Sequence, residues 1–413
     1  MRILIYEAMP DIVRADVIIR IARDYEAQGH TVFLLLDENV HLLKRNEIVQ
    51  PHIVNCLNVI RSKLPKTGIP FFATPINRLL SKKFLESPSD KILEEIAAYK
   101  SNFHEKALKN FQPDTIIIWN GLMDYQRNFI GLAKNVNPRQ KFSFLESGWF
   151  PQKNTYYSDP EGVNAASSLS RVSPPPLTPE QTAKIKKWKE QYRDSYGAPK
   201  ICDKGYYFIP LQLETDTNIT LFSPFKSMEE LLLWILENTD SERTIIVRPH
   251  PLSDCDHKEF SKLSDRIQVD GKTPLQSLLA ESHAVIGINS TVLLESLIFE
   301  KPTIALGQGV FQHSKAIYLQ PQDTPIPRKL DSTFSPIEKQ EAFLYYLKER
   351  QRPIPTAGVS INRTLQTTGI ETTKYSELEQ VVSSVKIRAR QYLNLLSSCL
   401  PWRGVTTSLS KSE

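Results

Sequence analysis

Two stretches, Thr244-Ile-Ile-Val-Arg-Pro-His-Pro251 and Ala284-Val-Ile-Gly-Ile-Asn-Ser-Thr291, decide the fold of this 413-residue chain. Each joins a short apolar run, rich in β-branched residues, to a group of polar residues. Such runs are typical of strands buried in a parallel sheet. Open α/β sheets bind their ligands at the carboxyl ends of their strands. We therefore expect both polar groups to line one binding site.

The polar residues at these strand ends suit an anionic ligand. Arg248 and His250 supply cationic or hydrogen-bond-donating groups after the first run. Asn289-Ser290-Thr291 supplies helix-capping side chains and free backbone N–H groups at the start of a helix predicted over 292–299. Lys272, after a short strand, is a second candidate partner for a phosphate or carboxylate. The pattern predicts a pocket for a phosphorylated donor.

Glu295 is a candidate ligand for a ribose. It lies four residues after Thr291, so both side chains share one face of the predicted helix. A carboxylate one turn below a phosphate could accept hydrogen bonds from both ribose hydroxyls. The alternative interpretation is an acidic residue in the first helical turn that interacts with the helix dipole.

Strand-like and helix-like segments alternate along the chain in two rounds. The first round is predicted at 2–7, 13–28, 31–36, 90–110, 115–119 and 142–145. A Pro-rich loop and a charged helix at 179–196 follow, and the second round is predicted at 206–213, 227–238, 244–247, 266–269, 274–281, 285–288, 292–299 and 303–306. Two Rossmann-like halves in tandem predict an α/β fold of the GT-B type, with the active site in an interdomain cleft.

This organisation predicts four parts. They are an N-terminal domain on the acceptor side at 1–200, a donor domain at 201–375, a C-terminal helix packing back across the domains at 376–402, and a flexible tail at 403–413. No P-loop and no Gly-x-Gly-x-x-Gly motif occurs, which argues against a nucleoside triphosphatase or a dehydrogenase.

Composition excludes several other classes. A net charge of +5 is too small for a dedicated nucleic-acid binder, and no apolar run reaches the length of a membrane span. Four scattered cysteines show neither metal-type nor disulfide-type spacing, so we expect a cytoplasmic protein. The segment 44–109 contains twelve Lys or Arg and six acidic residues. It predicts either association with anionic lipid at the inner face of the cytoplasmic membrane or a solvated helix face.

Carboxylates also follow apolar runs in both halves. Glu146 precedes a glycine, Gly148, in the first half, and Glu214 and Asp216 end a run in the second. One carboxylate from each side of a cleft is what glycosyl transfer needs, one at the anomeric centre and one for the acceptor proton. Asp11 and Asp124 are alternatives on spacing alone.

These residues together resemble a known family, the retaining β-Kdo glycosyltransferases of bacterial capsule and lipopolysaccharide assembly, which include Kps-type capsule enzymes and O-antigen-capping relatives. The matching motifs lie between residues 115 and 310. They are Trp119-Asn120-Gly121, Glu146-x-Gly148-x-x-Pro151, Gly162-Val-Asn164, Pro210-Leu-Gln212-x-x-x-Asp216, Arg248-Pro-His250-Pro and Ile286-Gly-Ile-Asn-Ser-Thr-Val-Leu-Leu-Glu295, with Lys301-Pro302 beyond.

The resemblance implies a CMP-β-Kdo donor, a glycan or glycolipid acceptor, and no cofactor or metal for transfer. It implies Asp216 as nucleophile, Glu146 as acid/base, His250, Ser290 and Thr291 on the phosphate, and Glu295 on the ribose. Arg248 or Lys272 is the expected partner of the Kdo carboxylate, and Asn289 belongs to the nucleotide side. Residues expected on the acceptor and sugar side are Asn120, Gly148, Asn164 and Gln212.

Two rival functions remain open at the level of sequence. An inverting CMP-sialic acid transferase shares the donor chemistry and would give the opposite anomeric product. A nucleotide- or glycan-binding module without catalysis would bind a CMP-sugar and not consume it.

Overall fold

The computed structural model describes residues 1–7, 12–36, 71–73, 90–253, 257–327, 330 and 334–356. The predicted helix at 376–402, the predicted tail and Asp11 lie outside the described residues. So does most of the basic segment 44–109, of which β3 (Phe71–Ala73) and α5 (Asp90–Phe111) are described.

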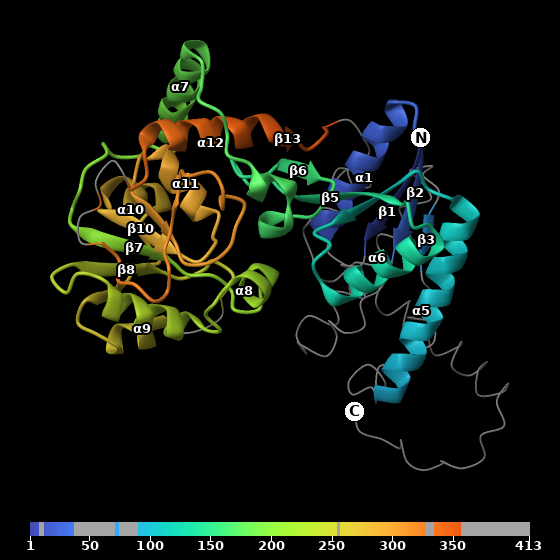
Figure 1. Ribbon diagram of the computed structural model, residues 1–413, viewed down its shortest axis with the longest axis horizontal. Coiled ribbons are helices and arrows are strands. Elements are labelled where there is room, and N and C mark those ends of the chain that lie inside the picture. Colours follow the sequence, from blue (N-terminus) through green and yellow to red (C-terminus); the bar gives the residue numbers. More distant parts are fainter. Residues whose placement is uncertain are drawn as a thin grey trace, which may run out of the picture. The chain divides into compact units, whose positions relative to one another are not determined.

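The first sheet is doubly wound. Its described strands are β1 (Arg2–Glu7), β2 (Thr31–Leu36), β3, β4 (Thr115–Trp119), β5 (Lys141–Ser147), β6 (Thr155–Asp159) and β13 (Arg352–Pro353), in the order β13-β6-β5-β4-β1-β2-β3. The five strands from β3 to β5 are parallel, whereas β6 pairs antiparallel with both β5 and β13. Helices α1 (Ile12–Ala27), α5 and α6 (Asp124–Val136) connect these strands (Figure 1).

The second sheet repeats this pattern. Its described strands are β7 (Tyr206–Pro210), β8 (Thr244–Arg248), β9 (Ile267–Val269), β10 (Ala284–Gly287), β11 (Thr303–Ala305) and β12 (Tyr318–Leu319). All pair in parallel, in the order β12-β11-β10-β7-β8-β9. The helices between them are α8 (Thr217–Phe222), α9 (Met228–Asn238), α10 (Leu275–Glu281) and α11 (Val292–Ile298).

The central strands β7 and β10 of the second sheet are buried along their whole length because both of their faces are covered. In β7, Tyr206 and Phe208 join the core under α10 and α11, whereas Tyr207 and Ile209 join the core under α9. Figure 1 shows α9 on one side of this sheet and α10 and α11 on the other. Alternate residues of a strand point to opposite faces, so a doubly covered strand needs apolar residues at every position.

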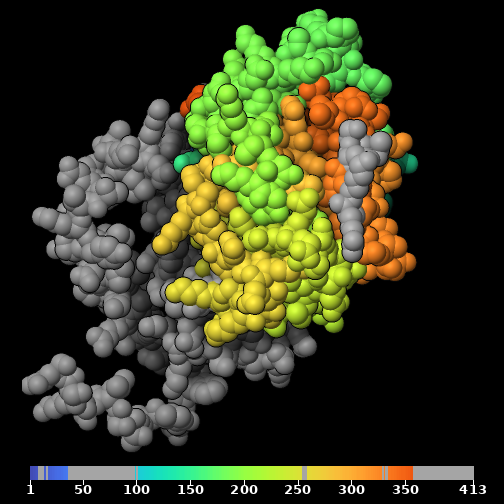
Figure 2. Space-filling view, turned by 90° about the vertical axis from the view of Figure 1, so that its left-hand side faces the viewer, coloured from blue at the N-terminus to red at the C-terminus, as the bar shows by residue number. Residues whose placement is uncertain are grey.

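Two long helices pack beside the second sheet. The capping box of Thr178 and Gln181 starts α7 (Pro179–Ser195), and this helix packs against α11 and α12 (Ile337–Arg350). In the space-filling view, the green surface of α7 lies next to the orange surface of α12 (Figure 2). The buried amine of Lys189 binds Glu300 at 2.7 Å and Glu341 at 3.1 Å, which ties the three helices together.

The topology confirms the predicted fold class. In chain order, each sheet places its first strand beside its fourth, which is the Rossmann arrangement, and two such sheets in tandem give a GT-B-type fold. The domain boundaries stay a prediction, and α7, which precedes residue 200, packs with helices of the second half. Among the described helices, none combines the length and apolar character needed to cross a bilayer.

Candidate functional site

The strand order of the second sheet reverses between β7 and β10, and two of the predicted site residues, Gln212 and Asn289, meet there. The loop after β7 carries Gln212, and the loop after β10 carries Asn289. Gln212 Nε2 donates to Asn289 Oδ1 at 2.9 Å, and the Asn289 backbone N–H donates to Gln212 Oε1 at 3.2 Å. Ligands of open α/β sheets bind at such a switch point.

Asn289 connects the segments that follow three neighbouring strands of the second sheet. Its Nδ2 donates to the carbonyl oxygens of Asn218 at 2.9 Å and Gln308 at 3.1 Å. The amide therefore links the loops after β7, β10 and β11. The structure gives Asn289 and Gln212 this positioning role, and their predicted contacts with nucleotide and sugar stay predictions.

Asp216 and His250 follow the neighbouring strands β7 and β8 and interact electrostatically. Asp216 is exposed and caps α8, accepting a hydrogen bond from the Asn218 backbone N–H at 2.7 Å. Burial lowers the pKa of His250, and the nearby Asp216 carboxylate acts in the opposite direction. The Leu252 backbone N–H donates to His250 Nδ1 at 3.1 Å, so the neutral ring carries its proton on Nε2.

The two candidate cations differ in their surroundings. The Arg248 guanidinium donates to the carbonyl oxygen of Thr273 and lies near Asp270. Hydrogen bonds from Thr273 lower the pKa of Asp270, with a smaller contribution from Arg248. Lys272 is exposed, and its backbone N–H donates to the same carboxylate at 2.9 Å. Arg248 is therefore the more firmly positioned of the two.

Ser290 and Thr291 border a narrow cavity that residues of the first half complete. The cavity has a volume of about 20 Å³, and its lining includes Trp149 and Asn164 together with Asn218, Ser290 and Thr291. Ser290 Oγ accepts a hydrogen bond from the Val292 backbone N–H at 3.2 Å, which caps the start of α11. The structure thus brings Asn164 to the predicted phosphate-binding hydroxyls.

Glu295 faces α7. Its carboxyl lies 3.3 Å from the hydroxyl of Tyr192, which donates to it. Burial raises the pKa of Glu295 to about 7, and the Tyr192 hydrogen bond offsets part of this effect. Burial and the nearby Glu295 in turn raise the pKa of Tyr192. The predicted contact of Glu295 with a ribose stays a prediction.

In the first half, Glu146 lies beside the turn that ends β4. Asn120 Nδ2 donates to Glu146 Oε2 at 2.8 Å, and the Ser147 backbone N–H donates to Oε1 at 2.9 Å. Asn120 has φ 69 and the following Gly121 has φ 88. The turn thus uses left-handed backbone, which Asn and Gly tolerate best, and it orients the amide toward the carboxylate.

Tyr157 connects Glu146 to the cavity. It is fully buried, and its pKa is raised well above the usual value, mainly by burial and also by the Glu146 charge. Its hydroxyl accepts a hydrogen bond from the Asn164 backbone N–H at 2.9 Å. Its ring stacks on Trp149 with 4.3 Å between centroids. Tyr157 therefore positions two residues of the cavity wall.

Gly148 has a steric role. A Cβ at this position would lie 2.1 Å from Thr155 Oγ1 and 3.2 Å from Gln351 Oε1. Gln351 Oε1 accepts from the backbone N–H groups of both Trp149 and Phe150 at 2.9 Å. Because Gly148 has no Cβ, Gln351, which follows α12, can lie close enough to bind the backbone at Trp149 and Phe150. Gly148 is needed for packing here, and its predicted place on the sugar side stays a prediction.

Sequence reasoning did not single out several residues that build this site. Tyr157, Tyr192, Asn218 and Gln351 act through partners distant in sequence or through backbone atoms, and these leave no motif. Among the described residues, no group of three or more His, Cys, Asp or Glu side chains is arranged to hold a metal ion.

Comparison with known proteins finds one family match and several distant relatives. Residues 182–332 match the model of the family described as capsule polysaccharide biosynthesis protein. The chain is 24% identical over 272 residues to Protein FixF of Sinorhizobium fredii, covering 62% of this chain and 61% of that protein. It is 27% identical over 123 residues to the capsule polysaccharide export protein KpsS of Escherichia coli, covering 26% of this chain and 31% of that protein.

Among solved structures, the chain is similar to the Thermosulfurimonas dismutans KpsC β-Kdo 2,7 transferase. The sequence identity is 16%, the TM-score is 0.49, and the match covers 88% of this chain and 97% of that chain. The chain spans less than two thirds of the length of FixF and of KpsS. The recognition made from the sequence is supported by the family match, in which residues 182–332 are similar to the capsule polysaccharide biosynthesis proteins.

Proposed function

We propose that the chain transfers β-Kdo from CMP-β-Kdo to a surface-polysaccharide or lipid-linked glycan acceptor, with retention of configuration. The single observation that supports the proposal is the electrostatic interaction between Asp216 and His250, which follow the neighbouring parallel strands β7 and β8. The family match over the same segment gives it a context in capsule assembly.

The first step is displacement of CMP. An Asp216 carboxylate oxygen attacks the anomeric carbon, the bond from that carbon to the phosphate oxygen breaks, and CMP leaves with the bonding electron pair. The product is a glycosyl ester of Asp216. His250 Nε2–H and the Ser290 and Thr291 hydroxyls donate hydrogen bonds to the leaving phosphate and stabilise its charge.

The second step transfers the sugar. Glu146 accepts the proton of the acceptor hydroxyl as its oxygen attacks the anomeric carbon and Asp216 leaves as a carboxylate. The Asn120 amide donates a hydrogen bond to one oxygen of Glu146. This bond keeps the side chain oriented both before and after Glu146 accepts the proton. Two displacements at one carbon restore its original configuration. Arg248 is the candidate partner of the Kdo carboxylate.

The test is an Asp216→Asn variant with CMP-β-Kdo generated in situ and synthetic Kdo-containing acceptors. Transfer should be lost while CMP affinity stays close to that of the unmodified chain, since Asp216 contacts the sugar. Asp265→Asn, outside the proposed site, is the matched control. Turnover near the original level in Asp216→Asn would exclude the nucleophile.

A second measurement separates the rival functions. Product NMR should show the β anomer, and an α product would assign an inverting transferase. His250→Ala should weaken CMP binding and slow transfer together. Tight CMP-sugar binding without any consumption, in the unmodified chain, would mean a binding module and would contradict the proposal.

A further inference from the structure

Two adjoining surface grooves lie outside the proposed transfer site. The inner groove has a volume of about 390 Å³ and runs along the ends of β11 and β12 beside α8. The outer groove has a volume of about 470 Å³ and lies along α9. Pro224 and Gln322 line both grooves, so the two form one continuous surface.

The inner groove is polar and carries no charge. None of the residues that line it is ionisable, and its polar side chains include four glutamines: Gln308, Gln312, Gln320 and Gln322. A glutamine amide both donates and accepts hydrogen bonds, which matches the hydroxyl groups of a sugar. Leu221 and Leu319 are 39% and 40% exposed and give the groove an apolar edge. The lining suits a neutral, hydroxyl-rich ligand.

Gln320 lines this groove with an amide that is only partly paired. It is 7% exposed, and its Nε2 donates to the carbonyl oxygens of Pro321 at 2.9 Å and Thr324 at 2.7 Å. These two acceptors fix the orientation of the amide. Its Oε1 is buried and accepts no hydrogen bond from the described part of the chain. Leaving a buried carbonyl unpaired is costly, so a ligand hydroxyl at this amide would be stabilising.

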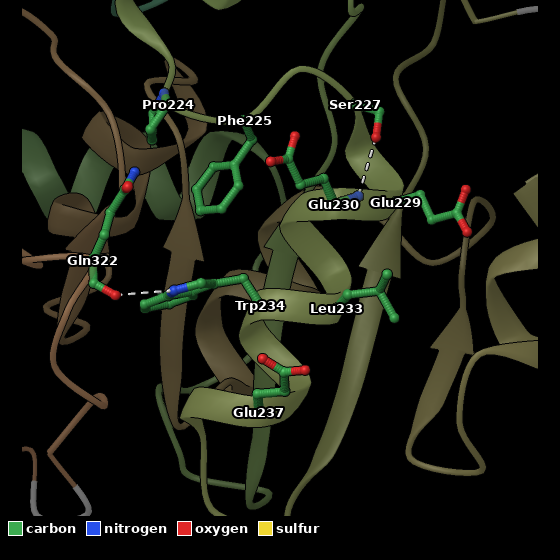
Figure 3. Close-up of a pocket in the computed structure, with 9 residues that line it drawn as sticks. All are labelled: Pro224, Phe225, Ser227, Glu229, Glu230, Leu233, Trp234, Glu237 and Gln322. Atoms are coloured by element: carbon green, nitrogen blue, oxygen red, sulfur yellow. Dashed lines mark hydrogen bonds between the residues drawn. The ribbon is translucent and has the colours of Figure 1, made fainter.

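The outer groove adds an aromatic wall and acidic side chains. Figure 3 shows the Trp234 indole next to Gln322, and Trp234 Nε1 donates to the Gln322 carbonyl oxygen at 3.2 Å. An indole face packs well against the apolar C–H face of a pyranose ring. Glu229 and Glu237 are exposed on the same helix and disfavour an anionic ligand.

We propose that the two grooves together bind a neutral oligosaccharide, with one sugar among the glutamines and the next against Trp234. The inner groove adjoins the proposed transfer site: α8 carries Asp216 at its start and Phe222 at its end, and six helical residues span about 9 Å. Binding here does not require the proposed transfer reaction.

The test is saturation-transfer NMR on the full chain without any nucleotide. Chitotriose is the neutral probe, trigalacturonate the anionic probe and trilysine the cationic probe. Chitotriose should bind and trigalacturonate should not, and trilysine, which the acidic side chains of the outer groove can attract, should not reproduce the chitotriose signal at Gln312. Trp234→Ala should weaken chitotriose binding by about tenfold, because it removes the stacking surface. Gln312→Ala should weaken it several-fold.

Gln191→Ala, on an exposed position of α7, is the matched control and should leave chitotriose binding unchanged. Gln312→Ala keeps the test decisive if Trp234→Ala does not fold, because Gln312 has no hydrogen-bonding role in the described fold beyond its backbone. The proposal is overturned if chitotriose fails to bind, if trigalacturonate binds as well, or if neither groove substitution weakens chitotriose binding.

Discussion

Replacing Glu295 by Gln should make the stability of the chain less dependent on pH. Burial raises the pKa of this carboxyl from 4.5 to about 7. The folded state therefore binds the Glu295 proton more tightly than the unfolded state does. The stabilisation is fully present below pH 4.5 and is lost as the pH rises through about 7.

The magnitude follows from the two pKa values. A shift of one pKa unit corresponds to about 1.4 kcal/mol, so ionising Glu295 in the folded state costs about 3 kcal/mol in total. Between pH 5 and pH 8, the unmodified chain should lose about 2.5 kcal/mol from this group alone. Glu295→Gln keeps an acceptor for Tyr192 and cannot ionise, so it should not show this loss.

The assay is urea unfolding followed by tryptophan fluorescence at pH 5 and pH 8. The unfolding free energy of Glu295→Gln, compared with that of the unmodified chain, should rise by about 2.5 kcal/mol from pH 5 to pH 8. Glu349→Gln, at an exposed position of α12, is the control and should follow the unmodified chain. A constant difference between Glu295→Gln and the unmodified chain at both pH values would refute the reasoning.

Three further substitutions test the packing around the site, each by urea unfolding. Lys189→Met should cost about 3–5 kcal/mol, because it leaves the buried Glu341 carboxylate unpaired. Adding Glu341→Met should recover part of the loss, and no recovery would argue against this pair. Tyr157→Phe should cost about 1–3 kcal/mol by removing the hydroxyl that accepts a buried backbone N–H, and an unchanged midpoint would exclude that role. Gly148→Ala should cost about 1–3 kcal/mol, because its Cβ would lie 2.1 Å from Thr155 Oγ1. An unchanged unfolding free energy would mean that the loop moves to accommodate the methyl group.

The core strands were predictable because their sequences carry a local signal. After an initial threonine, the runs at 115–119 and 244–247 are apolar, and both form parallel strands in the structure, with β8 extending one residue further to Arg248. The predicted strand at 206–213 is shorter, ending at Pro210. Beyond that point Gln212 bonds to Asn289, and the chain leaves the sheet.

The sequence by itself determined the fold class, most of the parallel core strands and which polar residues follow them. Those features depend on hydrophobic periodicity and on the chemistry of short motifs, and both can be recognised within a short stretch of sequence. Only the tertiary structure decided that Tyr192 meets Glu295, 103 residues away, and that Gln351 holds the Trp149 loop. A hydrogen bond between distant segments depends on how whole helices and sheets pack, and that packing leaves no pattern in the local sequence.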